Sequence, residues 1–248
     1  QFEIQLRHAD ILEAADRAFL YKSGVKEIVA RKGMTASFMA KFDSADFGSG
    51  CHVHQSVLDQ QSGRNLFWDP QREHHISPLM AHYAGGLIAT LTDFTLMWAP
   101  YVNSYKRLDV GTAAGINKTW GIDNRTVGVR VLAESEGSCR LEQRAPGADI
   151  NPYIALAGML AGGLHGMEKK IPPPSLSVGN AYDLPPEEAE QVPRTLGAAV
   201  ELFRKSPTAR EYLGEPFVEY YAEFKNCEYR QFCAHVTEWE KRKYLEMA

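Results

Sequence analysis

The sequence predicts an α+β fold, in which helices pack on one side of an antiparallel sheet and a helical segment forms the C-terminal part. Strand patterns are separated by helical patterns, but too few crossovers are present for a doubly wound parallel sheet. Two of the strands carry polar side chains at every second position, as antiparallel sheets with one solvent-facing side do. The last segment, Pro193 to Ala248, has the amphipathic spacing of three or four helices.

The first quarter of the chain predicts one helix and two strands. Apolar residues recur at helical spacing from Asp10 to Arg31, and Gly33 is a natural stop for that helix. Residues Thr35 to Lys41 alternate and include β-branched and aromatic side chains, which predicts a strand. Gly50 to Leu58 predicts a second strand. A hairpin turn at Ser62 to Arg64 then leads into the apolar Leu66-Phe67-Trp68 run.

The middle of the chain predicts a long helix, a loop and a third strand. Ser77 is a favourable N-cap and Pro78 a favourable first helical residue, and the helix is expected to reach about Trp98. Tyr101 to Trp120 lacks periodicity and reads as a loop. Thr126 to Ala133 alternates, so its valines are expected on one face of a strand and Arg130 on the other.

A second long helix is expected from Asn151 to Lys169. Its many Ala and Gly residues indicate close packing against another element. Pro172 to Pro174 ends it and begins a polar connection that extends to Glu188.

Composition narrows the class of protein. Over 248 residues, 44% hydrophobic and 23% charged content are those of an ordinary soluble protein. A net charge of −4 gives no reason to expect nucleic acid as a partner. The longest apolar run, Gly85 to Pro100, contains threonines and Asp93 and therefore predicts a buried helix, with no membrane partner. Four cysteines without CxxC spacing indicate reduced thiols and a cytoplasmic location.

Two histidines stand out in the strand that follows Gly48-Ser49-Gly50. Because alternate side chains share a face, His52, His54 and Ser56 are expected to point the same way. A lone histidine in a strand is more often a hydrogen-bonded packing residue than a metal ligand. A pair at i and i+2 after a glycine turn leaves packing and metal binding equally open.

Arg140, Glu142 and Arg144 occupy one face of another predicted strand. They could form a solvated charged face or a structural triad, although desolvation makes such a triad a weak source of stability. Glutamate oxygen suits magnesium or manganese, and flanking arginines suit carboxylate or phosphate groups.

Further cations bracket the same strands at Lys106, Arg107, Arg125 and Arg130. Basic residues spread like this are usually solvated surface charges, but phosphoryl transfer also needs several cations around the migrating group. Together with the histidine strand, these residues outline a catalytic sheet face.

Six motifs follow one another along the chain: Gln1-x-Glu3, Gly48-Ser49-Gly50-x-His52-x-His54-x-Ser56, Asn103-Ser104-Tyr105-Lys106-Arg107-Leu108, Asn124-Arg125-Thr126 with Arg130, Arg140-x-Glu142-x-Arg144 and Asn151-Pro152-Tyr153. Taken in this order, they resemble the glutamine synthetase superfamily. The resemblance covers nearly the whole chain. It implies an ATP-dependent ligase that activates the γ-carboxylate of glutamate as an acyl phosphate and joins it to an amine.

The resemblance also implies a role for each matching residue. ATP would be a substrate, and two or more Mg²⁺ or Mn²⁺ ions would serve as cofactors. The implied metal ligands are Glu3, His52 and Glu142; the implied nucleotide-binding residues are His54, Ser56, Arg130 and Arg140; the implied glutamate-binding residues are Gly48, Arg107 and Arg144; and the implied catalytic residue, which stabilises the transferred phosphate, is Arg125.

The resemblance implies that residues 1–248 are part of a longer catalytic domain. The chain begins at Gln1 without a methionine, and its first residues read as the end of a strand. The small β-grasp domain of the family and the first catalytic strands, with their paired glutamates, are expected upstream. In the family that small domain completes the site of a neighbouring subunit. The expected assembly is therefore a homo-oligomeric ring, a dodecamer, and the fragment alone is expected to be inactive.

Two departures from the family pattern bear on the substrate. Phe47 stands where many members carry asparagine, and Ala113 stands where ammonia-using members carry a glutamate that binds ammonium and takes its proton. Alanine does neither and leaves more room, which favours an organic primary amine, such as a polyamine or ethanolamine-like compound, over ammonia. Two alternatives stay open: a true glutamine synthetase, and a non-catalytic relative that keeps the fold for structural or regulatory binding.

Overall fold

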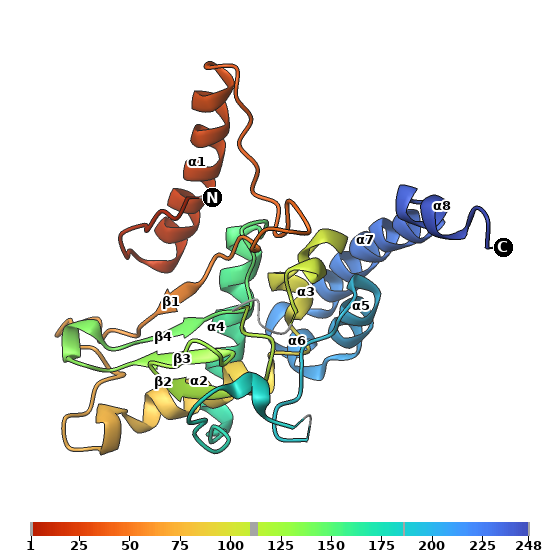
Figure 1. Ribbon diagram of the computed structural model, residues 1–248. Helices are drawn as coiled ribbons and strands as arrows, with labels where there is room; N and C mark the ends of the chain where they lie inside the picture. The colour runs from red at the N-terminus through yellow and green to blue at the C-terminus, as the bar shows by residue number, and fades with distance from the viewer. Residues whose placement is uncertain (1, 110–113, 186, 248) are drawn as a thin grey trace.

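The computed structural model describes residues 2–109, 114–185 and 187–247 and confirms the α+β fold (Figure 1). Its four-stranded sheet has the order β1 (Val53–Gln55), β4 (Arg140–Gln143), β3 (Val129–Leu132) and β2 (Trp120–Ile122). β4 pairs antiparallel with both β1 and β3, whereas β2 pairs parallel with β3. The predicted antiparallel sheet therefore ends in one parallel edge strand.

Two helices lie along one face of this sheet, α2 (Pro78–Ala89) and α4 (Pro152–Lys169) (Figure 1). Their contact is close because glycines meet there, and a Cβ atom added to Gly86 would collide with the backbone of α4 at Gly162 and Gly166. The close packing expected for the Ala- and Gly-rich helix is thus present. On the sheet, Val129, Val131 and Leu141 are fully buried in the same core.

The helix predicted from Ser77 to Trp98 is two helices, so its expected length was wrong. Ser77 caps α2 as expected, accepting a hydrogen bond from the Met80 amide over 3.1 Å, but α2 ends at Ala89 and α3 spans Thr95–Trp98. At the break, the Thr90 hydroxyl donates to the Gly86 carbonyl over 2.8 Å. Such back-bonding by threonine bends or ends a helix.

The predicted strand from Thr35 to Lys41 was also wrong, since these residues are irregular. The backbone of this segment bonds elsewhere: the Ala40 carbonyl accepts from the Ser49 amide, and Lys41 exchanges two hydrogen bonds with the Asn103 side chain. The second predicted strand shortens to β1, with single bridges at Gly50 and Leu58 marking its expected ends.

Helix α1 (Ile11–Ala30) projects from the body of the protein and contacts α4 near its base (Figure 1). The C-terminal segment holds four helices among the described residues, as expected: α5 (Leu196–Lys205), α6 (Pro207–Leu213), α7 (Glu215–Ala234) and α8 (Glu238–Tyr244). In the described part of the chain, no helix is long and apolar enough to cross a membrane.

Short 3₁₀ helices connect these elements. They are η1 (Glu73–His75), η2 (Val102–Lys106), η3 (Glu136–Ser138) and η4 (Ala181–Asp183). Two of them matter for the site, because η2 leads directly into Arg107 and η3 leads into β4.

Candidate functional site

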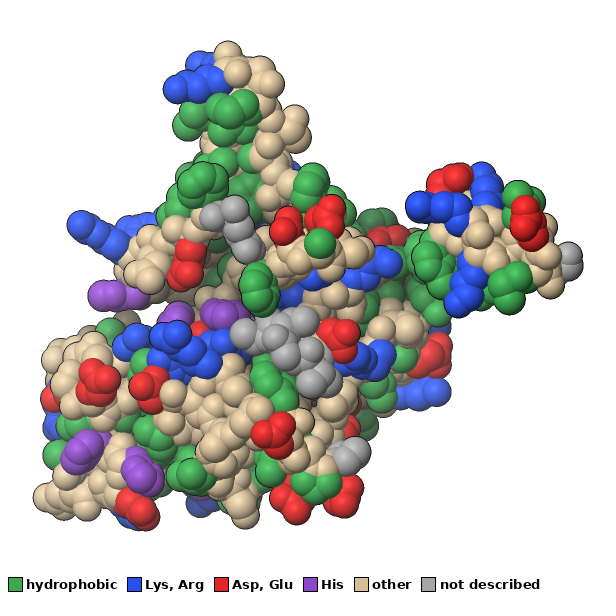
Figure 2. Space-filling model, in the orientation of Figure 1, with side chains coloured by type: hydrophobic (Ala, Val, Ile, Leu, Met, Phe, Trp, Pro, Cys, Tyr) green, Lys and Arg blue, Asp and Glu red, His purple; other side chains and the backbone are tan. Residues whose placement is uncertain are grey.

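The face of the sheet turned away from α2 and α4 is polar. His54 of β1 lies directly opposite Glu142 of β4, which in turn lies opposite Arg130 of β3. Directly opposed residues project from the same side of a sheet, so one row crosses three strands. Histidine and basic side chains gather in the hollow between α1 and the sheet, as Figure 2 shows.

Glu142 is the centre of this polar face. Its Oε1 accepts hydrogen bonds from His52 Nδ1 over 3.0 Å and from Arg144 Nη1 over 2.6 Å, and its Oε2 accepts from Arg130 Nη1 over 2.9 Å. Burial of the side chain would raise the pKa of Glu142, but the bond from His52 and the charge of Arg144 outweigh burial and lower that pKa to about 2. The carboxylate is therefore ionised at neutral pH.

His52 meets this carboxylate as a neutral imidazole. Burial lowers the pKa of His52, and the nearby Arg144 and Arg107 lower it further, which outweighs the hydrogen bond to Glu142. The proton therefore lies on Nδ1, which donates to Glu142, and Nε2 retains its lone pair. Nε2 also lies close to the Cα of Gly50, where an added Cβ would be 3.2 Å from it. A neutral imidazole nitrogen beside a buried carboxylate is a metal-binding arrangement.

His54 and Arg140 form a second pair at the rim of the polar face. Arg140 Nε donates to His54 Nδ1 over 3.1 Å, and Arg140 Nη1 donates to the Ser138 carbonyl of η3 over 2.7 Å. Ser56 is exposed two residues beyond His54. Both hydrogen-bond acceptors of Arg140 are neutral, so neither neutralises the charge of its guanidinium. An anion from solution could therefore pair with Arg140.

Arg107 enters the site from η2, with 3% of its surface exposed. Its Nη1 donates to the Ala145 carbonyl over 2.8 Å and its Nη2 to the Arg144 carbonyl over 3.3 Å. Desolvation by burial lowers the pKa of Arg107 to about 10, so the guanidinium remains charged at neutral pH. The Arg107 guanidinium is therefore held at the backbone of Arg144, whose own guanidinium donates to Glu142.

Gly48 lies against Arg107, and the space between them requires glycine. A Cβ atom at Gly48 would lie 2.6 Å from Arg107 Cγ and 2.9 Å from the Ala40 carbonyl oxygen. The segment is held by two further backbone bonds, from Cys51 N to the Pro146 carbonyl and from Ala148 N to the Ser49 carbonyl. The glycine turn, Arg107 and the end of β4 are thus one packed unit.

Nine of the eleven predicted site residues come together around this unit and the sheet face, and no hydrogen bond or ion pair among the described residues joins the other two to them. Glu3 is exposed in the extended segment before α1, and Arg125 is exposed in the connection between β2 and β3. Neither side chain forms a hydrogen bond or an ion pair with another described residue. Their roles remain predictions from the resemblance. Ala113 lies outside the described residues, and Phe47 is 79% exposed beside Gly48.

The donors present fit a divalent metal that keeps much of its own hydration. His52 and Glu142 supply one nitrogen and a carboxylate, and no group of three or more His, Cys, Asp or Glu that could hold a metal occurs within residues 2–109, 114–185 and 187–247. Two protein ligands suit Mg²⁺ or Mn²⁺ completed by water and phosphate oxygens, and are too few for a closed structural zinc site.

Two acidic residues of this region were not found by sequence reasoning. Asp123 accepts from Arg130 Nε over 3.0 Å, so Arg130 bridges Asp123 and Glu142. Asp149 follows β4 and accepts from the Ser104 hydroxyl over 2.6 Å. No periodic pattern in the sequence indicates either aspartate, because both lie in connections between regular elements. The course of such a connection depends on contacts with distant residues.

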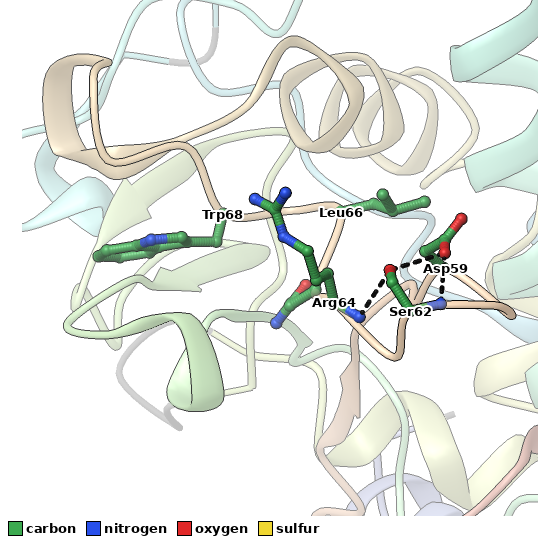
Figure 3. A pocket seen from close by; sticks show the side chains of 6 residues that line it. Asp59, Ser62, Arg64, Leu66 and Trp68 are labelled. Atoms are coloured by element: carbon green, nitrogen blue, oxygen red, sulfur yellow. Dashed lines mark hydrogen bonds between the residues drawn. The ribbon is translucent and has the colours of Figure 1, made fainter.

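A separate shallow pocket of about 320 Å³ lies in the hairpin after β1. Its lining residues are Asp59, Ser62, Arg64, Asn65, Leu66 and Trp68, and Asp59 accepts hydrogen bonds from the Ser62 amide and hydroxyl (Figure 3). No residue of the polar sheet face lines it. The candidate site is therefore the sheet face and not this pocket.

Curated relatives resemble the chain over its whole length. It is 40% identical over 247 residues to a glutamate–isopropylamine ligase of a Pseudomonas species, covering 100% of this chain and 54% of the relative. It is 41% identical over 248 residues to the type-1 glutamine synthetase 2 of Dictyostelium discoideum, covering 99% of this chain and 47% of that protein. The chain thus spans about half the length of the curated relatives that it matches.

A solved structure shares both fold and sequence with the chain. The structure titled "Apo GmaS without ligand" superposes with a TM-score of 0.86 at 36% identity, covering 96% of this chain and 54% of that one. Residues 1–244 match the family described as "Glutamine synthetase, catalytic domain". With the His52–Glu142 pair and its arginines on the sheet face, this match over nearly the full length shows that the chain belongs to the glutamine synthetase catalytic-domain family.

Proposed function

We propose that the protein containing this chain is an ATP-dependent ligase that joins glutamate to an amine through an acyl phosphate. The observation that carries this proposal is the Glu142 carboxylate with His52, Arg130 and Arg144 converging on it. A structural scaffold gains little from such a cluster, because desolvation of the charges offsets their attraction. A site for phosphoryl transfer needs cations around a carboxylate that can hold a metal.

Glutamate would bind where Gly48, Arg107 and Arg144 meet. Arg107 donates to backbone carbonyls and is held in place, so its guanidinium is oriented before the substrate arrives. Arginine matches a carboxylate through paired N–H donors, and the bare backbone at Gly48 lets the substrate approach closely. In this placement the γ-carboxylate of the substrate would face the sheet.

The nucleotide and its metal would occupy the polar face itself. His52 and Glu142 would hold one Mg²⁺ or Mn²⁺ ion, and Glu3 is proposed for another. Bound there, such an ion neutralises charge on the transferring phosphate. His54, Ser56, Arg130 and Arg140 would contact the nucleotide, which is consistent with the outward charge of Arg140. Arg125, from the β2–β3 connection, would stabilise the phosphoryl group in transfer.

The proposed reaction has two steps. The γ-carboxylate oxygen of glutamate attacks the γ-phosphorus of ATP, forming a carboxylate–phosphate bond while the bond to ADP breaks. The amine nitrogen then attacks the activated carbonyl carbon, an amide bond forms and inorganic phosphate leaves, with one proton of the amine released. Positioned arginines assist both steps by neutralising charge that develops on oxygen.

An organic primary amine is the proposed acceptor. Ala113 provides neither the charge that attracts ammonium nor a base for its proton, and a relative of 40% identity is a glutamate–isopropylamine ligase. The alternative, glutamine synthesis from ammonia, has the support of the type-1 glutamine synthetase relative. We further propose a cytoplasmic, ring-shaped homo-oligomer; the four free cysteines agree with a reducing compartment.

The test uses the full-length protein that contains this chain. Phosphate release is measured with ATP, glutamate and Mg²⁺ or Mn²⁺, in the presence of isopropylamine, ethanolamine, a polyamine or ammonium. The proposal expects release that depends on glutamate and is fastest with an organic amine. Faster release with ammonium than with every organic amine would reject that acceptor in favour of glutamine synthesis.

A second measurement separates enzyme from scaffold. Calorimetry on the full-length protein should detect binding of ATP in the presence of Mn²⁺, and an Arg107→Ala variant should retain this binding while losing activity. A wild-type protein that neither binds ATP nor releases phosphate with any amine would support the non-catalytic alternative instead.

A further inference from the structure

The position of Arg107 depends on contacts outside its own element. Arg107 follows η2, a 3₁₀ helix of five residues, and short 3₁₀ helices have poor hydrogen-bond geometry and little stability of their own. Its backbone amide donates to the Ser104 carbonyl over 3.1 Å. Whatever fixes Ser104 therefore fixes the backbone from which the Arg107 side chain extends.

Ser104 is fixed by a buried carboxylate on another part of the chain. The Ser104 hydroxyl donates to Asp149 Oδ2 over 2.6 Å and accepts from the Tyr101 amide over 3.0 Å. Ser104 is 2% exposed, so this short bond is shielded from water. It joins η2 to the segment between β4 and α4, the segment that also supplies the carbonyl acceptors of Arg107.

Helix α1 holds the same segment from the other side. Lys22 Nζ donates to the carbonyls of Ala148 and Ile150, each over 2.9 Å, and these two residues flank Asp149 in sequence. Three elements that are distant in sequence therefore converge at Asp149: α1, η2 and the β4–α4 connection. Asp149 is therefore held on both sides, by Ser104 at its side chain and by Lys22 at the carbonyls of its two neighbours.

The hydrogen bond from Ser104 does not by itself require a charged side chain at Asp149. A neutral amide would accept that bond equally well, and Asp149 Oδ1 is buried without a hydrogen-bond partner among the described residues. Burial raises the pKa of Asp149 above its ordinary value, although the hydrogen bond from Ser104 and the positive charge of Arg107 each lower it. In turn, Asp149 is the foremost group that raises the pKa of the desolvated Arg107 guanidinium. A buried carboxylate beside a buried guanidinium compensates its charge.

We propose that Asp149 is a positioning residue for Arg107: it anchors η2 through Ser104 and supplies the counter-charge that lets the guanidinium stay buried and ready for a substrate carboxylate. This inference rests on the proposed function, because it assigns Arg107 to the binding of glutamate. It predicts an effect on glutamate and not on ATP, since the residues proposed for the nucleotide lie on other elements.

The test compares Asp149→Asn with a matched control in the full-length protein. Asparagine keeps an acceptor for Ser104 but removes the charge. Asp93→Asn is the control, because Asp93 accepts from the Ser206 hydroxyl over 2.7 Å in the same manner, between the α2–α3 turn and α6. For Asp149→Asn we expect the KM for L-glutamate to rise at least tenfold with the KM for ATP within twofold of wild type. The control should leave both within twofold.

Two further readouts keep the outcome decisive. Hydrogen exchange of residues 101–109 should be at least fivefold faster in Asp149→Asn than in wild type and unchanged in Asp93→Asn. Ser104→Ala, which keeps the charge, should speed this exchange but raise the KM for glutamate less than Asp149→Asn does. A folded Asp149→Asn protein whose KM for glutamate stays within twofold of wild type, or rises together with the KM for ATP, would overturn the inference.

Failure of the proposed function gives a different result. If the wild-type protein does not bind L-glutamate in calorimetry, the ligase proposal fails, and hydrogen exchange alone then decides whether Asp149 positions the Arg107 segment. Unchanged exchange in Asp149→Asn would reject the positioning role as well, whereas faster exchange would support it for an anion other than glutamate.

Discussion

His52 Nδ1 lies 3.0 Å from Glu142 Oε1, although the residue directly opposite Glu142 in the sheet is His54. His52, which directly precedes β1, thus contacts the carboxylate diagonally across the two strands. His54, which lies directly opposite Glu142, instead accepts a hydrogen bond from Arg140. The two histidines, two residues apart, therefore belong to different halves of the site. One lies beside the buried carboxylate, and the other at the exposed rim.

Replacing Glu142 should reveal how much the cluster contributes to folding. Glu142→Gln leaves the buried Arg144 without its counter-charge and leaves Arg130 with Asp123 alone, so we expect the metal-free protein to lose about 3 kcal/mol of unfolding free energy at neutral pH. The folded pKa of about 2 lies below the ordinary value of 4.5, so the contribution is complete above pH 4.5 and is lost as pH falls toward 2. Urea unfolding from about pH 7 down to about pH 3 measures both. A difference between wild type and variant that does not shrink in acid would contradict this account.

Replacing Gly48 should disturb Arg107 by steric contact alone. In Gly48→Ala the new Cβ would lie 2.6 Å from Arg107 Cγ, so we expect a loss of about 1–3 kcal/mol in stability and weaker glutamate binding. Gly24→Ala is the control: Gly24 lies inside α1 with no atom within 4 Å of the added Cβ, and alanine there should stabilise by about 0.5–1 kcal/mol. Thermal unfolding and glutamate titration check both variants. Equal behaviour of the two would show that space at Gly48 is not limiting.

Restoring a carboxylate in the loop after Arg107 should change the preferred amine. In Ala113→Glu, the new side chain would attract ammonium and accept its proton, so we expect the ratio of ammonium to isopropylamine turnover to rise by about tenfold or more. Phosphate release by the full-length protein with each amine gives this ratio. Ala114→Glu, which introduces the same charge at a buried neighbour, controls for general damage to the loop. A ratio that is unchanged in Ala113→Glu would remove the basis for assigning amine choice to this position.

The thiols should differ widely in reactivity. Cys139 is 1% exposed, and burial raises its pKa to about 11, whereas Cys233 is exposed on α7. Because the thiolate is the reactive form, iodoacetamide at about pH 8 should modify Cys233 at least about a hundredfold faster than Cys139. Peptide mass spectrometry after timed labelling measures the rates. Comparable rates in the native protein would mean that the β4 end of the sheet opens readily.

The sheet face could be predicted from sequence because it depends on a local rule. Alternation places His52 with His54, and Arg140 with Glu142 and Arg144, whatever the strands pair with. The same rule failed at Thr35 to Lys41, since alternation does not supply a partner strand, and Ala40 and Lys41 instead bond to Ser49 and Asn103. A pattern predicts which side chains share a face but not whether a neighbouring strand is present.

The remaining site depends on contacts between distant segments. Asp149 gains its place from Ser104 and Lys22, neither of which any local spacing connects to it. At the break after Ala89 the Thr90 hydroxyl bonds back to the Gly86 carbonyl of α2. From sequence alone, one threonine was too weak a signal to end a helix predicted from the apolar run around it. Family resemblance named Glu3 and Arg125 as site residues, and both are exposed in this structure without a hydrogen bond or ion pair to another described residue, so their roles stay predictions.

The pairing of β1 with β4 joins residues that are about 90 positions apart in the chain, which has a consequence for how the protein is made. Closing a loop of that length costs on the order of 4 kcal/mol in chain entropy, so this contact forms slowly compared with helices. At a synthesis rate of roughly 5–20 residues per second, Glu142 leaves the ribosome several seconds after His52. During that interval the segment that carries His52 and His54 is exposed on the nascent chain, because β4 and the Glu142 carboxylate are not yet available to it.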